Sequence, residues 1–213
     1  MSIPEFTLVC FIVLAAVIWR IWMYRRHWQD ILVEGTEEAL DPWENRPILW
    51  LARGGGLGLL PKAPGTWGSL GGLGWTALLL LSGNFWIFVS GTLVAAGVSV
   101  WICGRAEKLL NQTDPGEIVL DEIIAVPACF IGLLGTIHFN GGNFPVVADL
   151  IHQPAAWCWV ASGFALFRLF DIWKPPPIRQ SQNLSGGWGV TIDDLLAAVY
   201  VNIVLQGAWL VVR

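Results

Sequence analysis

Long apolar runs separated by short polar segments dominate this chain of 213 residues. The first run, 6–24, is about as long as a helix that crosses a bilayer. Further runs cover 67–81 and 85–104, and others start near Leu120, Pro154 and Asp194. The residues Ser82-Gly83-Asn84 favour a turn, which predicts a helical hairpin. The pattern as a whole predicts an all-α, membrane-associated helical bundle with about six apolar helices, one of them an N-terminal anchor.

Polarity along the chain predicts three parts. Residues 1–26 are expected to form an N-terminal transmembrane anchor, because no lysine or arginine precedes the apolar run and no clear cleavage site follows it. Residues 27–47, which contain several acidic residues, are predicted to be an acidic interfacial linker. Residues 48–213 are predicted to be the main helical domain. The positive-inside rule places the N-terminus outside and Arg25 in the cytoplasm.

The composition strengthens the membrane interpretation. Hydrophobic residues make up 55% of the chain and charged residues only 13%, with a mean hydropathy of +0.60, which is typical of a membrane protein. The net charge of -4 gives no basic face for a nucleic-acid backbone, so that class of partner is excluded. The cysteines show no Cys-x-x-Cys spacing and are interpreted as buried apolar residues; they are Cys10, Cys103, Cys129 and Cys158.

If successive apolar helices cross the membrane in opposite directions, most charges of the main domain lie on the cytoplasmic face. The segments that meet there contain Lys62, Arg105 with Lys108, residues 114–122, residues 168–179, and Asp193 with Asp194. The loops on the opposite side, 82–84 and 139–153, contain no lysine or arginine. Charged residues at the ends of apolar helices usually mark function, so the candidate chemistry lies on the cytoplasmic side.

The acidic residues have a spacing that favours joint action. Glu117 and Asp121 are four residues apart, which would place them on one helix face next to Glu122. Asp193 and Asp194 are expected to begin another helix. Each carboxylate alone is compatible with an ordinary helix cap. Gathered carboxylates without histidine or cysteine instead suit a hard cation such as Mg²⁺.

Two further segments have more than one interpretation. The glycine-rich segment 54–69 has backbone N–H groups that could surround a phosphate, although it lacks the Gly-Lys-Ser/Thr of a Walker A loop. Alternatively, Gly68 and Gly72 allow close helix packing. Both interpretations stay open on spacing alone. The proline run 175–177 is interpreted as a rigid elbow that holds Lys174 and Arg179 relative to Asp171.

Four segments together resemble one family, phosphatidylglycerophosphatase A. They are Pro61–Ser69 (PKAPGTWGS), Asp114–Glu122 (DPGEIVLDE), Phe167–Arg179 (FRLFDIWKPPPIR) and Gly186–Asp194 (GGWGVTIDD). They occur in the family's order, and the resemblance covers residues 48–212. The chain departs from the family pattern in the loop 180–185, which lacks the usual charged residues, and at 125–127, where Ala-Val-Pro replaces the usual Gly and Trp.

The resemblance implies a Mg²⁺-dependent lipid phosphatase that removes the terminal phosphate of phosphatidylglycerophosphate to give phosphatidylglycerol. It also implies a multi-pass protein of the bacterial inner (cytoplasmic) membrane, with its site facing the cytoplasm. The partners expected are the lipid substrate and the membrane, and homo-oligomerisation is left open.

Residue roles follow from these motifs as a hypothesis. The expected catalytic residues are Asp121, Asp171 and Asp194. The expected phosphate-binding residues are Lys62, Thr66, Arg168, Lys174 and Arg179. The expected metal ligands are Glu117, Asp121, Glu122, Asp171, Asp193 and Asp194.

Other functions fit the sequence less well. There is no Cys-x5-Arg loop and no Asp-x-Asp pair, so covalent cysteinyl or aspartyl phosphatase chemistry is not favoured. A membrane transporter or ion-handling protein is the main alternative, and it would spread its acidic residues through the membrane depth. A third alternative keeps the family fold without activity.

Overall fold

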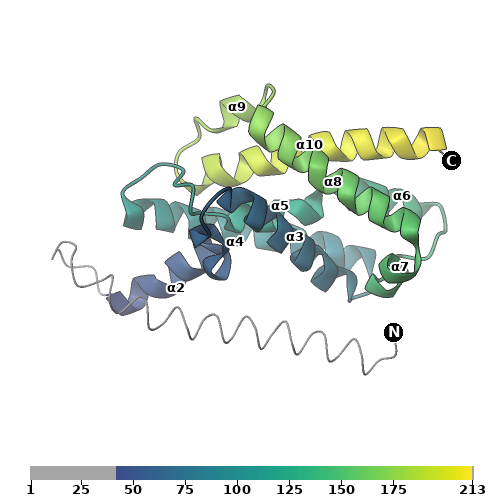
Figure 1. Ribbon diagram of the computed structural model, residues 1–213, viewed down its shortest axis with the longest axis horizontal. Helices are drawn as coiled ribbons and strands as arrows, with labels where there is room; N and C mark the ends of the chain where they lie inside the picture. The colour runs from purple at the N-terminus through teal and green to yellow at the C-terminus, as the bar shows by residue number, and fades with distance from the viewer. Residues whose placement is uncertain (1–41, 213) are drawn as a thin grey trace. The chain divides into compact units, whose positions relative to one another are not determined.

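The structure, a computed structural model, describes residues 42–212 (Figure 1). Within this range the regular elements are all helical, which confirms the all-α prediction. The chain divides into two compact units, Met1–Pro42 and Trp43–Arg213, and all features described below lie in the second apart from Pro42, where its first helix begins. The predicted anchor 1–26, Cys10 and most of the predicted linker lie outside the described residues.

Helices of very different length follow one another along the chain. The elements are α2 (Pro42–Ala52), the 3-10 helix η1 (Gly54–Leu59), α3 (Pro64–Leu80), α4 (Phe85–Leu110), α5 (Leu120–Ala128), α6 (Ile131–Phe139), α7 (Val147–His152), α8 (Pro154–Trp173), α9 (Ile178–Ser181) and α10 (Gly187–Val212). Helix α2 contains the last residues of the predicted linker. The predicted turn joins α3 to α4, and there the Asn84 side chain caps α4 by accepting from the N–H groups of Trp86 and Ile87.

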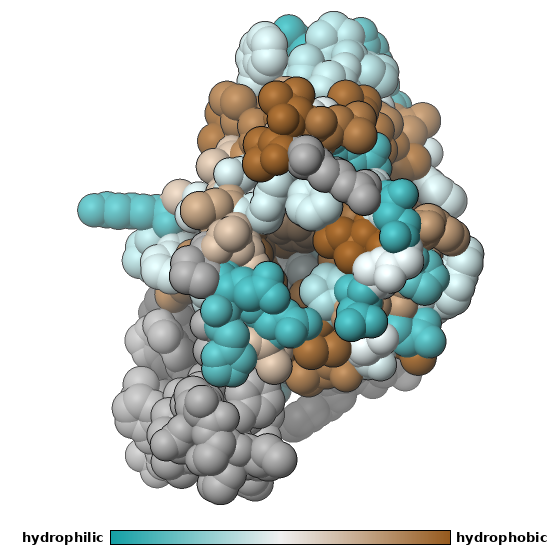
Figure 2. Space-filling view, turned by 90° about the vertical axis from the view of Figure 1, so that its right-hand side faces the viewer, coloured by the Kyte–Doolittle hydropathy of each residue, from teal (hydrophilic) through white to brown (hydrophobic). Residues whose placement is uncertain are grey.

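Four stretches in the described part of the chain are long and apolar enough to cross a membrane. They are Phe85–Leu110, Leu120–Phe139, Ala155–Trp173 and Gly187–Val212. Many apolar side chains on them point outward: Leu93 and Ile203, for example, are 64% and 65% exposed. Figure 2 shows brown hydrophobic residues in a band across the upper part of one end, between teal and white polar residues. Helices that are apolar on their outer faces are typical of proteins surrounded by lipid.

Helix α5 lies at the centre of the bundle and contacts α3, α4 and α10. Its residues Ala125 and Val126 are buried with Phe88 of α4, Phe167 of α8 and Val201 of α10. Because α5 is enclosed in this way, its first turn carries Asp121 and Glu122 into the protein rather than toward the surrounding medium.

The apolar run that starts at Leu120 is a helix interrupted once. Pro127 lies inside α5, and α6 starts only at Ile131. A proline has no N–H group and crowds the preceding turn, so helices often end or bend near it. After the proline, the N–H groups of Cys129 and Phe130 bond to the carbonyls of Val126 and Pro127, which tightens the chain between the two helices.

Helix α10 starts earlier than the sequence analysis expected. Asp193 and Asp194 were predicted to begin this helix, but it begins at Gly187. Its first turn needs glycine because neighbouring backbone lies close: a Cβ on Gly187 would overlap the Val100 carbonyl, and one on Gly189 would lie 2.6 Å from the Leu184 carbonyl oxygen. The two aspartates therefore lie in the second turn of α10.

The cysteine prediction is only partly correct. Cys103 and Cys129 are buried, as predicted, whereas Cys158 is exposed. Cys158 lies on α8 next to Trp157, which is 55% exposed. This part of α8 is apolar but faces outward, so hydrophobicity alone did not indicate burial.

Candidate active site

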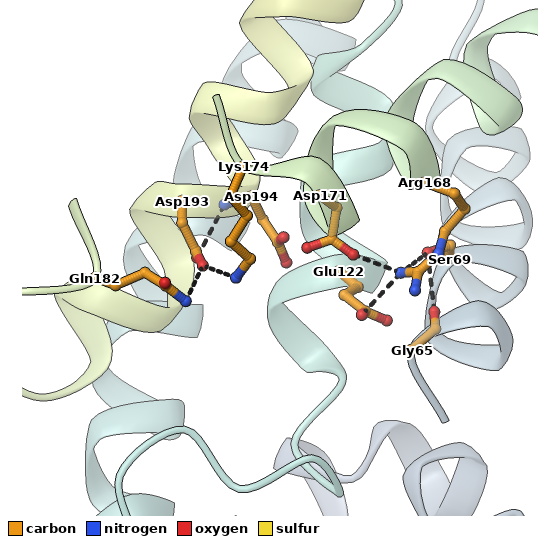
Figure 3. Close-up of polar contacts among 9 residues, drawn as sticks. All are labelled: Gly65, Ser69, Glu122, Arg168, Asp171, Lys174, Gln182, Asp193 and Asp194. Carbon is orange, nitrogen blue, oxygen red and sulfur yellow. Dashed lines mark hydrogen bonds and ion pairs between the residues drawn. The ribbon is translucent and has the colours of Figure 1, made fainter. Parts of the chain in front are cut away.

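Acidic and basic side chains from distant parts of the chain gather at neighbouring ends of the main helices (Figure 3). The first turn of α5 supplies Asp121 and Glu122. The last turns of α8 supply Arg168 and Asp171, and α10 supplies Asp193 and Asp194. We refer to the seven residues Asp121, Glu122, Arg168, Asp171, Lys174, Asp193 and Asp194 as the charged cluster.

Arg168 joins three helices at one side of the cluster. Its Nη1 donates to Glu122 Oε1 of α5 at 3.0 Å and to Ser69 Oγ of α3 at 3.2 Å. The same nitrogen lies 2.7 Å from Asp171 Oδ2, one turn further along α8. The side chains of Arg168, Glu122 and Asp171 are only 18%, 13% and 12% exposed. If one of these side chains moved away, it would leave a buried charge unpaired, which is energetically costly. The three side chains are therefore held in place.

Lys174 and Asp193 form the second ion pair of the cluster. Lys174 Nζ lies 2.6 Å from Asp193 Oδ2, and Gln182 Nε2 donates to the same oxygen at 3.2 Å. The other oxygen, Oδ1, accepts from the Asp194 N–H at 3.0 Å. Asp193 is 4% exposed, and these three donors hold its carboxylate in place.

The end of α8 determines where Lys174 lies. Lys174 adopts a left-handed conformation, with φ 47° and ψ 60°, and its N–H bonds to the Phe170 carbonyl, so it ends the helix. Pro175 follows directly. Partial burial alone would lower the pKa of Lys174, but the hydrogen bond to Asp193 and the nearby charges of Asp193, Asp171 and Asp194 outweigh burial and raise the pKa above its ordinary value. The ammonium group therefore stays charged at neutral pH.

The glycines of α3 allow this helix to approach Glu122 closely. A Cβ on Gly65 or on Gly68 would overlap the Glu122 carboxylate. The Ser69 hydroxyl accepts a hydrogen bond from Arg168 and donates one to the Gly65 carbonyl at 2.9 Å. A Cβ on Gly72 would lie 2.7 Å from Val126 of α5. At these positions the close-packing interpretation of the glycine-rich segment is therefore correct.

The cluster carries more negative than positive charge. Asp194 experiences repulsion from Asp121, Asp171, Asp193 and Glu122, whereas only Arg168 and Lys174 contribute positive charge to the cluster. In the described part of the chain, three of its buried oxygens lack a hydrogen-bond partner: Asp121 Oδ1, Glu122 Oε2 and Asp194 Oδ2. Buried carboxylate oxygens without partners are costly, so the arrangement favours binding a cation or protons.

The donor chemistry fits a hard divalent cation, since the available ligands are carboxylate oxygens. Among residues 42–212, however, no group of three acidic, histidine or cysteine side chains has its ligand atoms positioned to hold a metal ion. Ion binding would require the carboxylates of α5, α8 and α10 to draw closer together. In such a shift the three unpartnered oxygens would be the ones to contact the ion, because they themselves accept no hydrogen bond.

The structure gives one expected metal ligand a different partner. Glu117 was expected to share a helix face with Asp121, but α5 begins only at Leu120, so Glu117 lies in the turn before it. Its Oε1 accepts from Arg53 Nη2 at 2.9 Å. That helical prediction was wrong because the Pro115-Gly116 pair precedes the helix.

The expected phosphate-binding residues divide into two groups. Arg168 and Lys174 belong to the charged cluster. Lys62 and Arg179 are exposed, and Thr66 is half-buried in the first turn of α3. Lys62 precedes α3 in a left-handed conformation with φ 70°. These three residues are not among the polar contacts of Figure 3.

Ser69, Gln182 and Glu107 make contacts in or near the charged cluster that the sequence analysis did not predict. Ser69 and Gln182 contact Arg168 and Asp193, as described above. Glu107 of α4 is 8% exposed, and its Oε1 accepts from the Asp114 N–H at 2.9 Å, which anchors the loop before α5. Ser69 ends a quoted motif and so had a signal, whereas Gln182 lies in a loop without recognisable pattern. An acidic residue near the end of an apolar helix was the available signal for Glu107.

Comparisons with known proteins point to one family. The family model for phosphatidylglycerophosphatase A matches residues 50–209. The phosphatidylglycerophosphatase A of Haemophilus influenzae is 38% identical over 160 residues, which cover 75% of this chain and 86% of that protein. The phosphatidylglycerophosphatase A of Escherichia coli is 35% identical over 161 residues, covering 75% of this chain and 78% of that protein.

A third relative has a different name. A Bacteroides thetaiotaomicron protein, named provisionally as a phosphatidylinositol-3-phosphatase, is 33% identical over 171 residues, covering 78% of this chain and 95% of that protein. No solved structure matches the chain significantly.

Proposed function

The chain belongs to the phosphatidylglycerophosphatase A family, and on that premise we propose that it hydrolyses phosphatidylglycerophosphate to phosphatidylglycerol and phosphate. We propose further that the reaction depends on Mg²⁺ and occurs at the cytoplasmic side of a bacterial inner membrane. The substrate is a phosphate monoester on a lipid headgroup, so the site must combine polar chemistry with access from the bilayer.

The observation that carries this proposal is the charged cluster. It contains five carboxylates and two cations from α5, α8, α10 and the residue that ends α8. All of them lie near helix ends, which suits a site at the membrane surface. An ion path would instead distribute such groups along the length of the helices.

Arg168 and Lys174 are the groups proposed to hold the substrate phosphate. The Arg168 guanidinium uses Nη1 for its three contacts, while its buried Nε has no partner in the described part of the chain. A guanidinium with a spare N–H can bind a phosphate oxygen in addition. Lys174 supplies a second positive charge next to Asp193, and both cations stabilise negative charge that develops on the phosphate oxygens during hydrolysis.

Asp194 is the proposed acceptor of the proton from the attacking water. Its Oδ2 is buried and has no hydrogen-bond partner among residues 42–212, and it lies between the two ion pairs in Figure 3. A positioned carboxylate of this kind can take a proton from water as the water attacks phosphorus. Asp171 and Asp193 orient the two cations on either side.

Mg²⁺ is proposed as the cation that balances the cluster. The residues proposed to hold it are Asp121 and Glu122, which own the other two unpartnered oxygens, with Asp171 and Asp193 nearby. When bound, such an ion would neutralise phosphate charge and lower the pKa of a water molecule.

The proposal is tested by phosphate release from phosphatidylglycerophosphate with the purified full-length protein in detergent. We expect release in the presence of Mg²⁺, its loss with excess chelator, and recovery when Mg²⁺ is restored. Release that continues at full rate in chelator would contradict the Mg²⁺ dependence. A protein that shows a cooperative thermal unfolding transition, and is therefore folded, but releases no phosphate under any metal condition would contradict the activity itself.

Substrate preference is tested in the same assay. Phosphatidylinositol-3-phosphate and phosphatidic acid are offered as competing substrates at equal concentration. The first is included because one relative is named after it. We expect a higher kcat/KM for phosphatidylglycerophosphate than for either competitor. A higher value for one of the competitors would retain the phosphatase chemistry but replace the proposed substrate.

A further inference from the structure

A groove of about 490 Å³ lies between the second half of α4 and the start of α10. None of its lining residues belongs to the charged cluster. The volume is in the range of sites that hold small molecules or lipid headgroups. The groove therefore merits a chemical interpretation separate from that of the active site.

One wall of the groove is a single stripe of α4. Gly97, Trp101, Arg105 and Lys108 follow one another at helical spacing, so they lie along one face. Trp101 is 64% exposed, and Arg105 and Lys108 are exposed at the end of the same stripe. The stripe thus changes from apolar to basic toward the C-terminal end of α4.

The other wall is the start of α10. It consists of Gly186, Gly187 and Trp188, and Trp188 is 57% exposed. Gly187 lies against the backbone of α4, where a Cβ on Gly104 would be 2.8 Å from the Gly187 nitrogen. The first N–H groups of a helix carry partial positive charge, so this wall adds to the attraction that Arg105 and Lys108 exert on an anion.

We propose that this groove binds an anionic phospholipid, with its phosphodiester at Arg105 and Lys108 and its apolar part against Gly97 and Trp101. Basic pockets between membrane helices favour such headgroups, and tryptophan is favoured at the headgroup level. Both walls belong to candidate membrane-spanning helices, so a lipid reaches the groove from the bilayer. Basic side chains that merely extend toward the interface would need no groove beside them.

This site goes beyond the proposed hydrolysis, because it binds a lipid without converting it. A lipid in the groove would contact Gly186 and Gly187, while Gln182, four residues before Gly186, contacts Asp193 of the charged cluster. The groove is therefore connected to the active site through the segment 182–187 but is formed by other residues.

The test measures binding of phosphatidylglycerol to the full-length protein in detergent by native mass spectrometry, with phosphatidylcholine as the zwitterionic comparison. Two variants change the groove in different ways. The double variant Arg105→Gln with Lys108→Gln removes its charge. Gly97→Leu fills its space, and since a Cβ at Gly97 meets no atom within 4 Å, it should not disturb packing. Gly74→Leu in α3 is the matched control, because Gly74 is equally open but does not line the groove.

We expect the wild-type chain and Gly74→Leu to prefer phosphatidylglycerol. The double charge variant should weaken its binding by about tenfold or more, in line with the attraction of two basic residues for an anionic headgroup. Gly97→Leu should weaken it as well, because the leucine takes the space of the lipid's apolar part. Equal binding of the two lipids by the wild type, or unchanged phosphatidylglycerol binding in both groove variants, would overturn the proposal. Loss of binding in Lys174→Gln with retention in Gly97→Leu would also overturn it, because the lipid would then lie in the charged cluster. The binding readout requires no turnover, so failure here is distinguishable from failure of the proposed activity.

Discussion

At the scale of single residues, the charged cluster contains side chains held in ion pairs and, beside them, carboxylate oxygens that have no hydrogen-bond partner in the described part of the chain. Arg168 and Lys174 are bound to carboxylates, and Asp193 accepts from three donors. Asp194 Oδ2, in contrast, is buried and lacks a hydrogen-bond partner among the described residues. A group that must take a proton from water needs an available lone pair, which is why we assign this role to Asp194.

Replacing Asp194 by asparagine keeps the shape of the side chain but removes the proton acceptor. We expect phosphate release to fall by about 10²–10⁴-fold, the usual contribution of a positioned acid or base. Thermal unfolding in detergent should change little, because no hydrogen bond to Oδ2 is lost. The matched control is Asp149→Asn in α7, outside the cluster, which should keep nearly full activity. An Asp194→Asn protein with more than half of the wild-type rate would remove Asp194 from the mechanism.

Substitution of Lys174 tests how much its buried ion pair with Asp193 contributes to stability. Lys174→Gln leaves the Asp193 carboxylate, which is 4% exposed, without its cation. Removing one partner of a buried pair typically costs about 3–5 kcal/mol, so we expect a clearly lower melting temperature in detergent. Combining Lys174→Gln with Asp193→Asn removes both charges and should recover part of the lost melting temperature. A double variant less stable than Lys174→Gln alone would contradict this account.

The pH dependence of that loss follows from the raised pKa of Lys174. A lysine whose pKa is higher in the folded than in the unfolded protein contributes stability that is complete below its ordinary pKa of 10.5 and is lost as pH rises through the folded pKa. The difference in melting temperature between wild type and Lys174→Gln should therefore be constant from neutral pH to about pH 9 and shrink only in stronger alkali. A difference that disappears by pH 9 would show that the ammonium loses its charge earlier than the contacts imply.

At the scale of helices, the crossing of α3 and α5 determines where Glu122 lies. Gly68→Ala would push a methyl group into the Glu122 carboxylate and to 2.8 Å from Val119 Cβ. Overpacking of this kind costs about 1–3 kcal/mol, and the shift would also displace Glu122 from Arg168. We expect lower stability and a reduced rate of phosphate release. Gly74→Ala in the same helix is the control, since a Cβ there meets nothing within 4 Å and should leave both properties unchanged.

The helices themselves were largely predictable from sequence, because runs of apolar residues must form helices when they are surrounded by lipid. Their ends were less predictable. The start of α10 at Gly187 depends on close contact with the α4 backbone, and the interruption after Pro127 divides one apolar run into α5 and α6. The contact at Gly187 depends on tertiary packing, which local sequence patterns do not contain, whereas Pro127 was a local signal for the interruption.

At the scale of the whole molecule, motifs that are far apart in the sequence meet as predicted, but not with every residue included. Glu122, Arg168, Asp171 and Asp193 have distinctive neighbours in sequence, and the structure brings them together. Glu117 looked equally suitable, yet it pairs with Arg53, because α5 begins too late to carry it inward. Gln182 had no sequence signal, since its contact with Asp193 depends on how the chain folds between α9 and α10.

The distribution of basic residues predicts how the whole molecule is oriented in its membrane. Lys62 lies just before α3, Arg105 and Lys108 lie in the last turns of α4, and Arg179 lies in α9, which follows the end of α8. The segments 82–84 and 139–153 contain no lysine or arginine. Positive residues favour the cytoplasmic side, so the active site should face the cytoplasm. Single cysteines at Gln180 and at Asn143, both exposed positions, test this after Cys10 and Cys158 are replaced by serine.

In intact spheroplasts, a membrane-impermeant maleimide should label Asn143→Cys at once, because the 139–153 segment is expected outside. Gln180→Cys should react only after the membrane is permeabilised. Total reactivity in detergent is the control, since both thiols must be accessible there. The reverse pattern would place the charged cluster outside the cell. The positive-inside bias of the main domain rests on only a few lysines and arginines. The reverse pattern would therefore mean that residues before 42 determine the orientation of the chain in the membrane.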